Sequence, residues 1–222
     1  MYKKALAMAV HLLTASGIVL AFWSIVLIVK GDAGNAMRVL ALTAVIDFID
    51  GTLARKADVK THTPNTDGGL IDNLVDYVTW VFAPIFWAWY FLDIHFLVCA
   101  VVLIASLFGF SHTQAKTNDH YFRGFPSYWN FLVFYFWLFQ FEAVLSSAIL
   151  IFCSALIFAP IKFIYPSRTK TLQKTTLTLS IPYFFMIVYM LWQLEVTPLW
   201  VTIASLYYPL YYFILSAIIT RK

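Results

Sequence analysis

Four aspartates lie at helical spacing within two apolar stretches of this 222-residue chain. Asp47 and Asp50 are three residues apart in the first stretch, and Asp72 and Asp76 are four residues apart in the second. Residues three or four apart share one face of an α-helix, so each pair points in one direction. One loop joins the two stretches, which allows both acidic faces to meet at the same depth. Four carboxylates that converge in an apolar environment stay ionised only when cations compensate them.

The side-chain chemistry predicts a site for divalent cations. The nearby ligands are oxygen atoms, without Cys or paired His, which suits Mg²⁺, Mn²⁺ or Ca²⁺ and argues against zinc or copper. Two divalent ions would balance the four negative charges. The alternative is that the aspartates form ion pairs between helices or lie at a solvated interface. The cations close enough in sequence for such pairing are Arg55, Lys56 and Lys60.

The order of these residues resembles the motif of the CDP-alcohol phosphatidyltransferases, D-G-x2-A-R followed by G-x3-D-x3-D. Residues 50–55 are Asp-Gly-Thr-Leu-Ala-Arg, residues 68–76 supply the second half, and Asp47 lies three positions upstream. Twelve residues separate Arg55 from Gly68. This spacer is longer than in most of the family and resembles that of its bacterial phosphatidylcholine synthase branch. Further blocks that resemble this branch are residues 10–17, 115–117, 124–130 and 165–169.

The resemblance implies an enzyme in which the hydroxyl of choline attacks the β-phosphate of CDP-diacylglycerol, giving phosphatidylcholine and CMP. It also implies Mn²⁺ or Mg²⁺ as the cofactor, with two ions, and a homodimer as the assembly. The implied metal ligands are Asp47, Asp50, Asp72 and Asp76, and Asp76 is also the implied general base. The implied CDP-binding residues are Asp50, Gly51, Ala54, Arg55 and Gly68.

The chemistry of that reaction agrees with the residues themselves. Metal ions held by carboxylates bind diphosphate oxygens and stabilise the charge that develops in the transition state, and an alcohol nucleophile needs a base beside it. A side chain at Gly51 or Gly68 would fill a groove in which the nucleotide lies close to the backbone; the alternative role of these glycines is close helix packing. Arg55 would bind the diphosphate or orient Asp47 and Asp50, and its alternative role is a cytoplasmic anchor.

Aromatic residues beside a polar segment are candidates for choline, because a quaternary ammonium binds aromatic faces by cation–π attraction. Tyr128 and Trp129 are the best placed, although Trp and Tyr also form interfacial belts in membrane proteins. Contacts with phosphate or lipid are expected from His11, Lys116 and Arg168. The alternatives are a hydrogen-bonded, buried His11 and cytoplasmic charges attracted to anionic lipid.

The composition indicates the environment in which these residues act. Apolar side chains make up 62% of the chain and charged ones 12%, against about 45–50% and about 25% in ordinary soluble domains. This excludes a soluble cytosolic enzyme, a disordered chain and a nucleic-acid-binding domain. The formal net charge of +4 is typical of basic loops that lie against anionic lipid.

We predict an all-α polytopic membrane protein in which residues 1–222 form a single domain. A membrane span needs ~20 apolar residues, and the apolar runs predict about eight transmembrane helices. The runs are residues 5–29, 36–54, 70–92, 96–110, 128–141, 144–161, 177–194 and 199–219. The first run is too long for the apolar part of a signal peptide, so we expect an uncleaved span.

The distribution of Lys and Arg predicts the orientation, because these residues gather on the cytoplasmic side. With eight spans and both termini cytoplasmic, 13 of the 15 fall inside, Lys222 among them, and only Lys30 and Arg38 fall outside. Joining the fifth and sixth runs into one helix through Glu142 would divide the 15 into 7 and 8. The distribution therefore favours eight spans, with the acidic site at the cytoplasmic face of a bacterial inner membrane.

The sequence leaves other activities open. The nearest is another reaction of the same family, that of a phosphatidylserine or phosphatidylglycerophosphate synthase. A phosphorylated acceptor would need an extra cluster of basic residues, and Lys116, Arg168 and Lys170 do not form a dense one. A cation transporter is the alternative from a different class. Its polar residues would line a path through both leaflets, whereas these acids are concentrated near one face.

Overall fold

The computed structural model describes residues 2–117, 119–166 and 168–221. Ser167, in the last of the family-like blocks, and Lys222, one of the cations assigned to the cytoplasmic side, lie outside the described residues. Across the described part, helices account for nearly all of the regular structure, as the sequence predicts. The described chain divides into two compact units, Met1–Phe91 and Leu92–Lys222.

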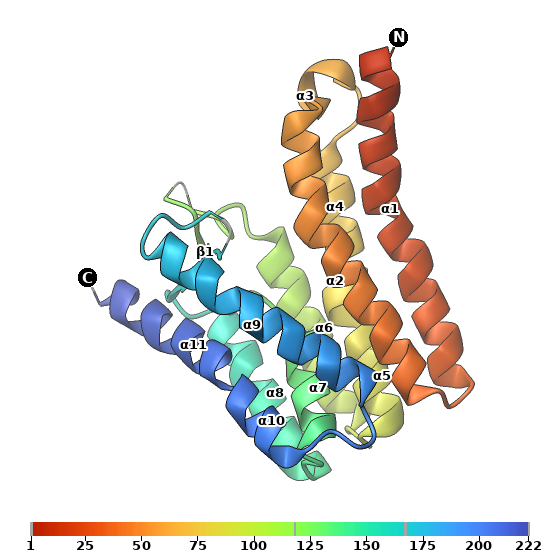
Figure 1. The fold of residues 1–222 in the computed structure, drawn as a ribbon, viewed down its shortest axis with the longest axis vertical. Helices are drawn as coiled ribbons and strands as arrows, with labels where there is room; N and C mark the ends of the chain where they lie inside the picture. The colour runs from red at the N-terminus through yellow and green to blue at the C-terminus, as the bar shows by residue number, and fades with distance from the viewer. Residues whose placement is uncertain (1, 118, 167, 222) are drawn as a thin grey trace. The chain divides into compact units, whose positions relative to one another are not determined.

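The first unit is built on a helical hairpin. Helices α1 (Tyr2–Val29) and α2 (Ala33–Lys56) pack side by side and antiparallel, and are drawn in red and orange in Figure 1. Gly31 makes the turn between them with a φ of 78°, a conformation that glycine adopts without a steric penalty. Asp32 then begins α2, because its side chain accepts a hydrogen bond from the backbone N–H of Asn35 at 3.0 Å.

A widened turn interrupts the long helical segment that completes this unit. The elements after α2 are α3 (Val59–His62), α4 (Gly68–Asp76), η1 (Tyr77–Phe82) and α5 (Ala83–Phe91). Element η1 is a π-helix, in which the N–H of Ala83 donates to the carbonyl of Val78, five residues earlier. Pro84 follows directly and has no N–H to donate, so the widened turn lies where α-helical bonding has to be interrupted.

Small side chains allow the helices of the first unit to approach closely. Ala21 of α1, Leu40 of α2 and Ala83 of α5 form one buried cluster. The hydroxyl of Ser24 donates to the backbone carbonyl of Ala36 at 3.0 Å, which ties α1 directly to α2. Close packing through small residues and interhelical hydrogen bonds is the usual basis of helix association in lipid.

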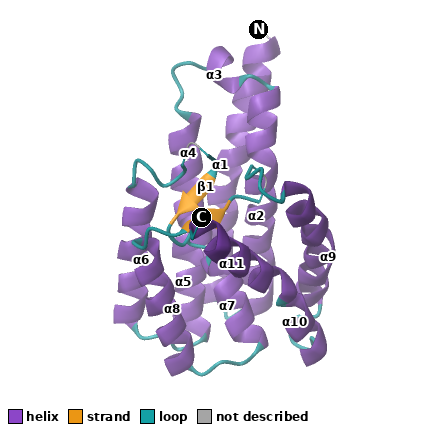
Figure 2. Ribbon diagram, turned by 90° about the vertical axis from the view of Figure 1, so that its left-hand side faces the viewer, coloured by secondary structure: helices purple, strands orange, loops and turns teal. Residues whose placement is uncertain are grey.

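The second unit combines helices with a short pair of strands. Its helices are α6 (Phe96–Ser111), α7 (Trp129–Leu138), α8 (Ala143–Ile157), α9 (Gln173–Trp192), α10 (Leu199–Ser205) and α11 (Tyr207–Thr220). The strands β1 (Tyr121–Arg123) and β2 (Lys162–Ile164), orange in Figure 2, pair antiparallel with Tyr121 opposite Ile164. Both strands fall in polar segments between the expected spans, so these segments are more ordered than the sequence indicates.

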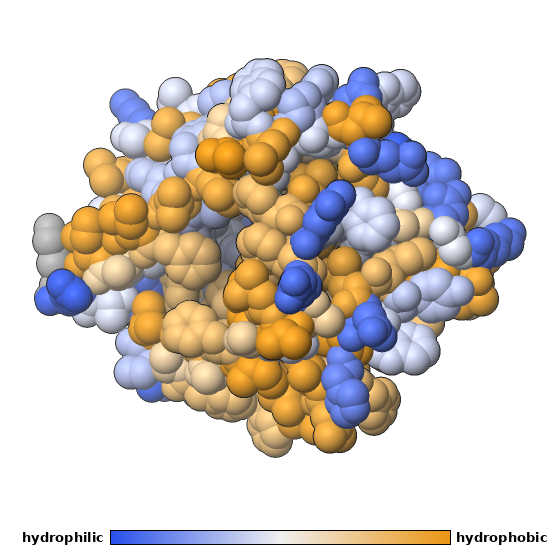
Figure 3. All heavy atoms as spheres, turned by 90° about the horizontal axis from the view of Figure 1, so that it is seen from below, coloured by the Kyte–Doolittle hydropathy of each residue, from blue (hydrophilic) through white to orange (hydrophobic). Residues whose placement is uncertain are grey.

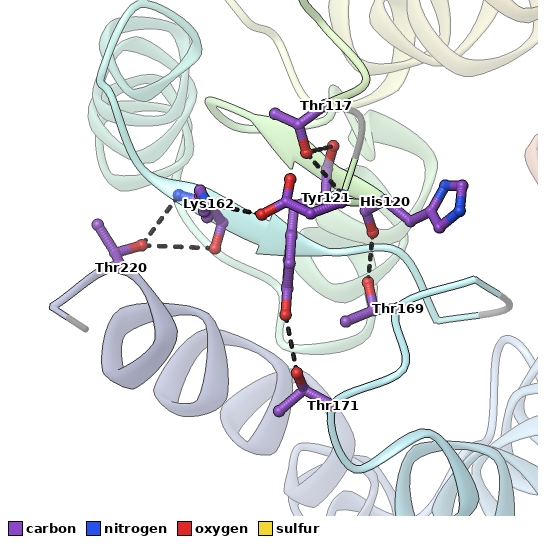
Figure 4. A network of polar contacts seen from close by, with 8 residues as sticks. Thr117, His120, Tyr121, Lys162, Thr169, Thr171 and Thr220 are labelled. Atoms are coloured by element: carbon purple, nitrogen blue, oxygen red, sulfur yellow. Dashed lines mark hydrogen bonds and ion pairs between the residues drawn. The ribbon is translucent and has the colours of Figure 1, made fainter.

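Polar contacts hold this pair of strands to its surroundings (Figure 4). The hydroxyls of Tyr121 and Thr171 are hydrogen-bonded at 2.9 Å, and Thr169 donates to the carbonyl of His120 at 2.6 Å. The ammonium of Lys162 donates to Asp119 at 2.7 Å. That hydrogen bond, together with a weaker one from Thr117, lowers the pKa of the Asp119 carboxyl.

The helices correspond to the apolar runs, with differences in length. Each expected run holds a helix or consecutive helices within the described residues. By length and apolar composition, four helical segments of the described chain can cross a membrane: Tyr2–Val29, Gly68–Phe91, Gln173–Trp192 and Leu199–Thr220. Apolar side chains also dominate the molecular face in Figure 3. The alternative of one helix through Glu142 does not form, because α7 ends at Leu138 and Gln140 has a φ of 51°.

Gly124 is predicted to contribute more to stability than a glycine in an open turn does. It has a φ of 79°, and a Cβ there would overlap the backbone carbonyl oxygen of Ile157 and lie 2.8 Å from its carbonyl carbon. Gly31 is the matched control, because its φ of 78° is nearly the same but a Cβ added there would meet no atom within 4 Å. Gly31→Ala should lose about 1–2 kcal/mol of stability from backbone conformation alone. Gly124→Ala should lose clearly more, measured by thermal unfolding in detergent; equal losses would show that the Ile157 contact is unimportant.

Candidate functional site

The structure brings together three of the four aspartates. Asp47 and Asp50 on α2 and Asp72 on α4 each offer a carboxylate oxygen, and within the described chain these oxygens all lie within 4.8 Å of one another. The side chain of Asp50 is buried, with 4% exposed, and the other two are half-buried. Their positions follow from helical spacing on α2 and from the packing of α2 and α4 on α1.

The donor set fits a divalent cation that prefers oxygen. The three ligand atoms are carboxylate oxygens, which suit Mg²⁺ and Mn²⁺. Because Asp50 is withdrawn from water, its charge needs compensation from within the site. It accepts a hydrogen bond from the hydroxyl of Thr14 on α1 at 2.7 Å. Arg55, one α-helical turn beyond Gly51, is exposed, and its guanidinium donates to the hydroxyl of Thr52 at 3.0 Å.

Asp76 lies one turn after Asp72, at the end of α4. It is half-buried and does not belong to the group of described carboxylates that meet within 4.8 Å. The π-helix begins with the next residue, and the hydroxyl of Thr79 donates to the backbone carbonyl of Asp76 at 3.5 Å. Single π turns are frequent at functional sites. Asp76 therefore stands at the junction between the acidic group and the widened turn.

The two motif glycines differ in what surrounds them. A Cβ on Gly68 would lie 2.7 Å from Cε1 of His11, so glycine is required there for the packing of α4 against α1. A Cβ on Gly51 would meet only the Arg55 guanidinium, at 3.6 Å, which is an ordinary contact. Close packing thus accounts for Gly68, whereas Gly51 has no such explanation. Ala54 packs against the buried cluster of Ala7, Val10 and Val59.

His11 is buried and tied to the segment between the two halves of the motif. Its Nε2 is 2.9 Å from the hydroxyl of Thr63. That hydroxyl also donates to the carbonyl of Val59 at 2.9 Å. A hydroxyl has one hydrogen, so His11 Nε2 is the donor in its bond with Thr63. This arrangement corresponds to the alternative in which His11 is a hydrogen-bonded buried residue.

The other residues singled out from the sequence lie in the second unit. Trp129 is 0% exposed, and its indole N–H donates to the hydroxyl of Ser106 at 2.8 Å. Tyr128 is half-buried among three further aromatic rings, those of Phe122, Phe131 and Tyr212, at centroid distances of 6.4, 6.2 and 5.9 Å. Lys116 and Arg168 are exposed, and the Arg168 guanidinium lies 5.4 Å from the centre of the Tyr165 ring.

The hydroxyl residues that support the acidic group are not predicted from the sequence. Thr14 bonds to Asp50, which lies 36 residues further along the chain. Thr63 bonds to His11, which lies 52 residues before it. The available signal was that Thr14 lies in the family-like block of residues 10–17, three residues after His11. A spacing of three places both side chains on the same side of α1.

Comparison with known proteins identifies relatives over most of the chain. A family model described as CDP-alcohol phosphatidyltransferase matches residues 7–204. A Borreliella burgdorferi protein named phosphatidylcholine synthase is 42% identical over 180 residues, covering 79% of this chain and 77% of the relative. Proteins of the same name from Legionella pneumophila and Rhizobium meliloti are 38% and 32% identical. The match to the Legionella pneumophila protein covers 75% of this chain and 67% of the relative. The match to the Rhizobium meliloti protein covers 98% of this chain and 92% of the relative.

Gly68→Ala is predicted to disturb the site, because the added methyl group would collide with the His11 ring. Gly69→Ala is the matched control, since the nearest atom to its Cβ is a side-chain oxygen of Asp67 at 3.4 Å. We expect Gly68→Ala to lose about 1–3 kcal/mol of stability, as overpacked sites do, and Gly69→Ala to change little. Thermal unfolding of both variants measures the difference. Combining Gly68→Ala with His11→Ala should recover part of the loss, and no recovery would rule out the His11 collision as its cause.

Proposed function

The chain belongs to the CDP-alcohol phosphatidyltransferase family, and we propose that it transfers the phosphatidyl group of CDP-diacylglycerol to choline. The products are phosphatidylcholine and CMP. The proposal is carried by the convergence of Asp47, Asp50 and Asp72 from the two halves of the motif. The relatives named phosphatidylcholine synthase support choline as the acceptor. The family match spans both compact units, which supports a single catalytic domain over residues 1–222.

In this proposal Asp47, Asp50 and Asp72 hold two Mn²⁺ or Mg²⁺ ions, with Asp76 completing the ligand set. When bound, such ions neutralise diphosphate oxygens and stabilise the charge that develops during phosphoryl transfer. The backbone at Gly51 leaves room for the nucleotide, since a Cβ added there would meet only the Arg55 guanidinium, at 3.6 Å. Arg55 is exposed beside it and binds the diphosphate. Ala54 and Gly68 complete the nucleotide-binding surface.

Asp76 is the proposed general base. Its carboxylate accepts the proton of the choline hydroxyl while the hydroxyl oxygen attacks the β-phosphate, and the bond to CMP breaks. A carboxylate is a weak base toward an alcohol, so orientation supplies much of the rate. The π turn that begins after Asp76 supports this role, because it gives the end of α4 a geometry that a regular helix lacks.

We further propose that aromatic and basic residues of the second unit contribute to substrate binding. The ring face of Tyr128 contacts the choline ammonium. Trp129, whose indole is held by Ser106, anchors the start of α7 directly after Tyr128. Lys116 and Arg168 are exposed cations suited to phosphate or lipid. His11 contributes by holding Thr63, in the segment between the two halves of the motif.

The membrane arrangement proposed from the charges has eight spans and both termini in the cytoplasm. Its site then faces the cytoplasm in a bacterial inner membrane, where CDP-diacylglycerol is embedded and choline is dissolved. The apolar helices and the bacterial relatives support this location. Family resemblance supports a homodimer.

The direct test is transfer of radiolabelled choline by the purified protein. With CDP-diacylglycerol and Mn²⁺ present, label should enter the lipid fraction as phosphatidylcholine, and excess EDTA should abolish the transfer. Labelled serine and glycerol 3-phosphate serve as competing acceptors. Transfer to either of these instead of choline would establish another family reaction, and choline transfer undiminished in EDTA would contradict the metal assignment.

Asp76→Asn should lower turnover by ~10² or more, the usual scale for a lost general base. The amide keeps the size of the side chain but cannot take the hydroxyl proton. CDP-diacylglycerol should still bind, since the three grouped carboxylates remain. Asp50→Asn is the comparison and should lose nucleotide binding and turnover together. Near-normal turnover in Asp76→Asn would exclude Asp76 as the base. If Asp76→Asn binds CDP-diacylglycerol as weakly as Asp50→Asn does, Asp76 is chiefly a metal ligand.

Tyr128→Ala should raise the KM for choline more than that for CDP-diacylglycerol. Loss of one cation–π face costs about 0.5–2 kcal/mol, which corresponds to roughly 2- to 30-fold in KM. Tyr128→Phe keeps the ring face and is the control, so its choline KM should stay near that of the unaltered protein. Steady-state kinetics with each substrate varied measures both constants. An unchanged choline KM in Tyr128→Ala would assign the ring to packing.

A further inference from the structure

One side of α1 contacts the elements that carry the acidic group. His11, Thr14 and Gly17 follow one another at intervals of three, which keeps them on the same side of the helix. All three are buried or half-buried. His11 lies against Gly68 of α4, and Gly17 lies against Val75 of the same helix. Between them, Thr14 bonds to Asp50 of α2. Helix α1 therefore touches both helices of the site without supplying a carboxylate.

The bond from Thr14 to Asp50 has the geometry of a strong hydrogen bond. Thr14 Oγ1 lies 2.7 Å from Asp50 Oδ2 and 3.4 Å from the carbonyl oxygen of Val10. The hydroxyl has one hydrogen, and the shorter distance together with the charge of the acceptor assigns it to Asp50. A donated O–H stabilises the negative charge of the carboxylate and restricts its rotation.

Helix α1 also approaches α4 closely on the side that carries Thr14. A Cβ on Gly17 would lie 2.8 Å from Cγ1 of Val75, closer than real side chains come. Glycine at this position therefore allows the two helices to meet one turn away from Thr14. The same side of α1 is held at its other end by His11, which lies against Gly68.

We infer that Thr14 is a positioning residue for divalent-cation binding, because its hydroxyl orients the buried carboxylate of Asp50. Ligands of metal ions are commonly fixed by hydrogen bonds from outer residues, and loss of such a residue typically costs 10- to 100-fold in metal affinity or activity. The inference rests on the proposed function, since it requires Asp50 to be a metal ligand.

The experiment measures Mn²⁺ binding directly, by electron paramagnetic resonance of free Mn²⁺ titrated with detergent-purified protein. Thr14→Val keeps the shape of the side chain and removes the hydroxyl, whereas Thr14→Ser keeps the hydroxyl. Ser16→Ala is the matched control, because the Ser16 hydroxyl donates at 2.6 Å to Leu13 within α1 itself. Thr14→Ala is included in case the valine variant does not fold.

We expect the Mn²⁺ dissociation constant to rise by about 10-fold or more in Thr14→Val, or in Thr14→Ala in its place. Thr14→Ser and Ser16→Ala should stay within about twofold of the unaltered protein. If the folded variant without the hydroxyl binds Mn²⁺ as tightly as the unaltered protein does, the role of Thr14 is overturned but the proposed metal site is not. An unaltered protein that binds no Mn²⁺ would overturn the proposed metal site and the role of Thr14 with it.

Discussion

The fold gathers the carboxylates of Asp47, Asp50 and Asp72 against their mutual repulsion. Their oxygens lie within 4.8 Å of one another, and two unit charges at that distance repel by about 3 kcal/mol at an effective dielectric constant of about 20. A fold that gathers them needs a compensating charge and a rigid frame. Divalent cations supply the charge in our account. In the proposed function the same ions attract the diphosphate of a lipid-linked nucleotide, so the acidic group that would destabilise the empty fold also recruits the substrate.

The frame is supplied by helix packing that leaves little room for adjustment. Gly17 and Gly68 each lie where a Cβ would come within 2.8 Å of a facing side chain, so a larger residue at either position would force α1 and α4 to shift. The buried His11 ties α1 to the spacer that separates the two halves of the motif. At the far end of α4 the π turn changes the helix directly after Asp76. These contacts hold the four aspartates of the proposed site on two helices of one compact unit, braced by α1.

Much of this site was predictable because its chemistry is encoded in local spacing. Asp47 and Asp50 share a helix face by their separation alone, and the apolar runs located the helices to within a few residues. Contacts between distant residues have no such signature, which is why the Thr14 hydroxyl was missed. The π turn also escaped prediction, because Pro84 indicates an interruption but not its form. Trp129 illustrates a further limit, since an aromatic residue beside a polar segment has the same pattern whether it faces a ligand or, as here, is fully buried.

Binding of divalent cations by the acidic group can be observed by manganese anomalous diffraction from crystals grown with Mn²⁺ and CDP-diacylglycerol. We expect two anomalous peaks per chain, each at coordination distance from the carboxylate oxygens of Asp47, Asp50, Asp72 or Asp76, and both absent in the Asp50→Asn variant. Peaks located elsewhere, or a lipid-nucleotide bound in this site without any manganese beside the aspartates, would contradict it.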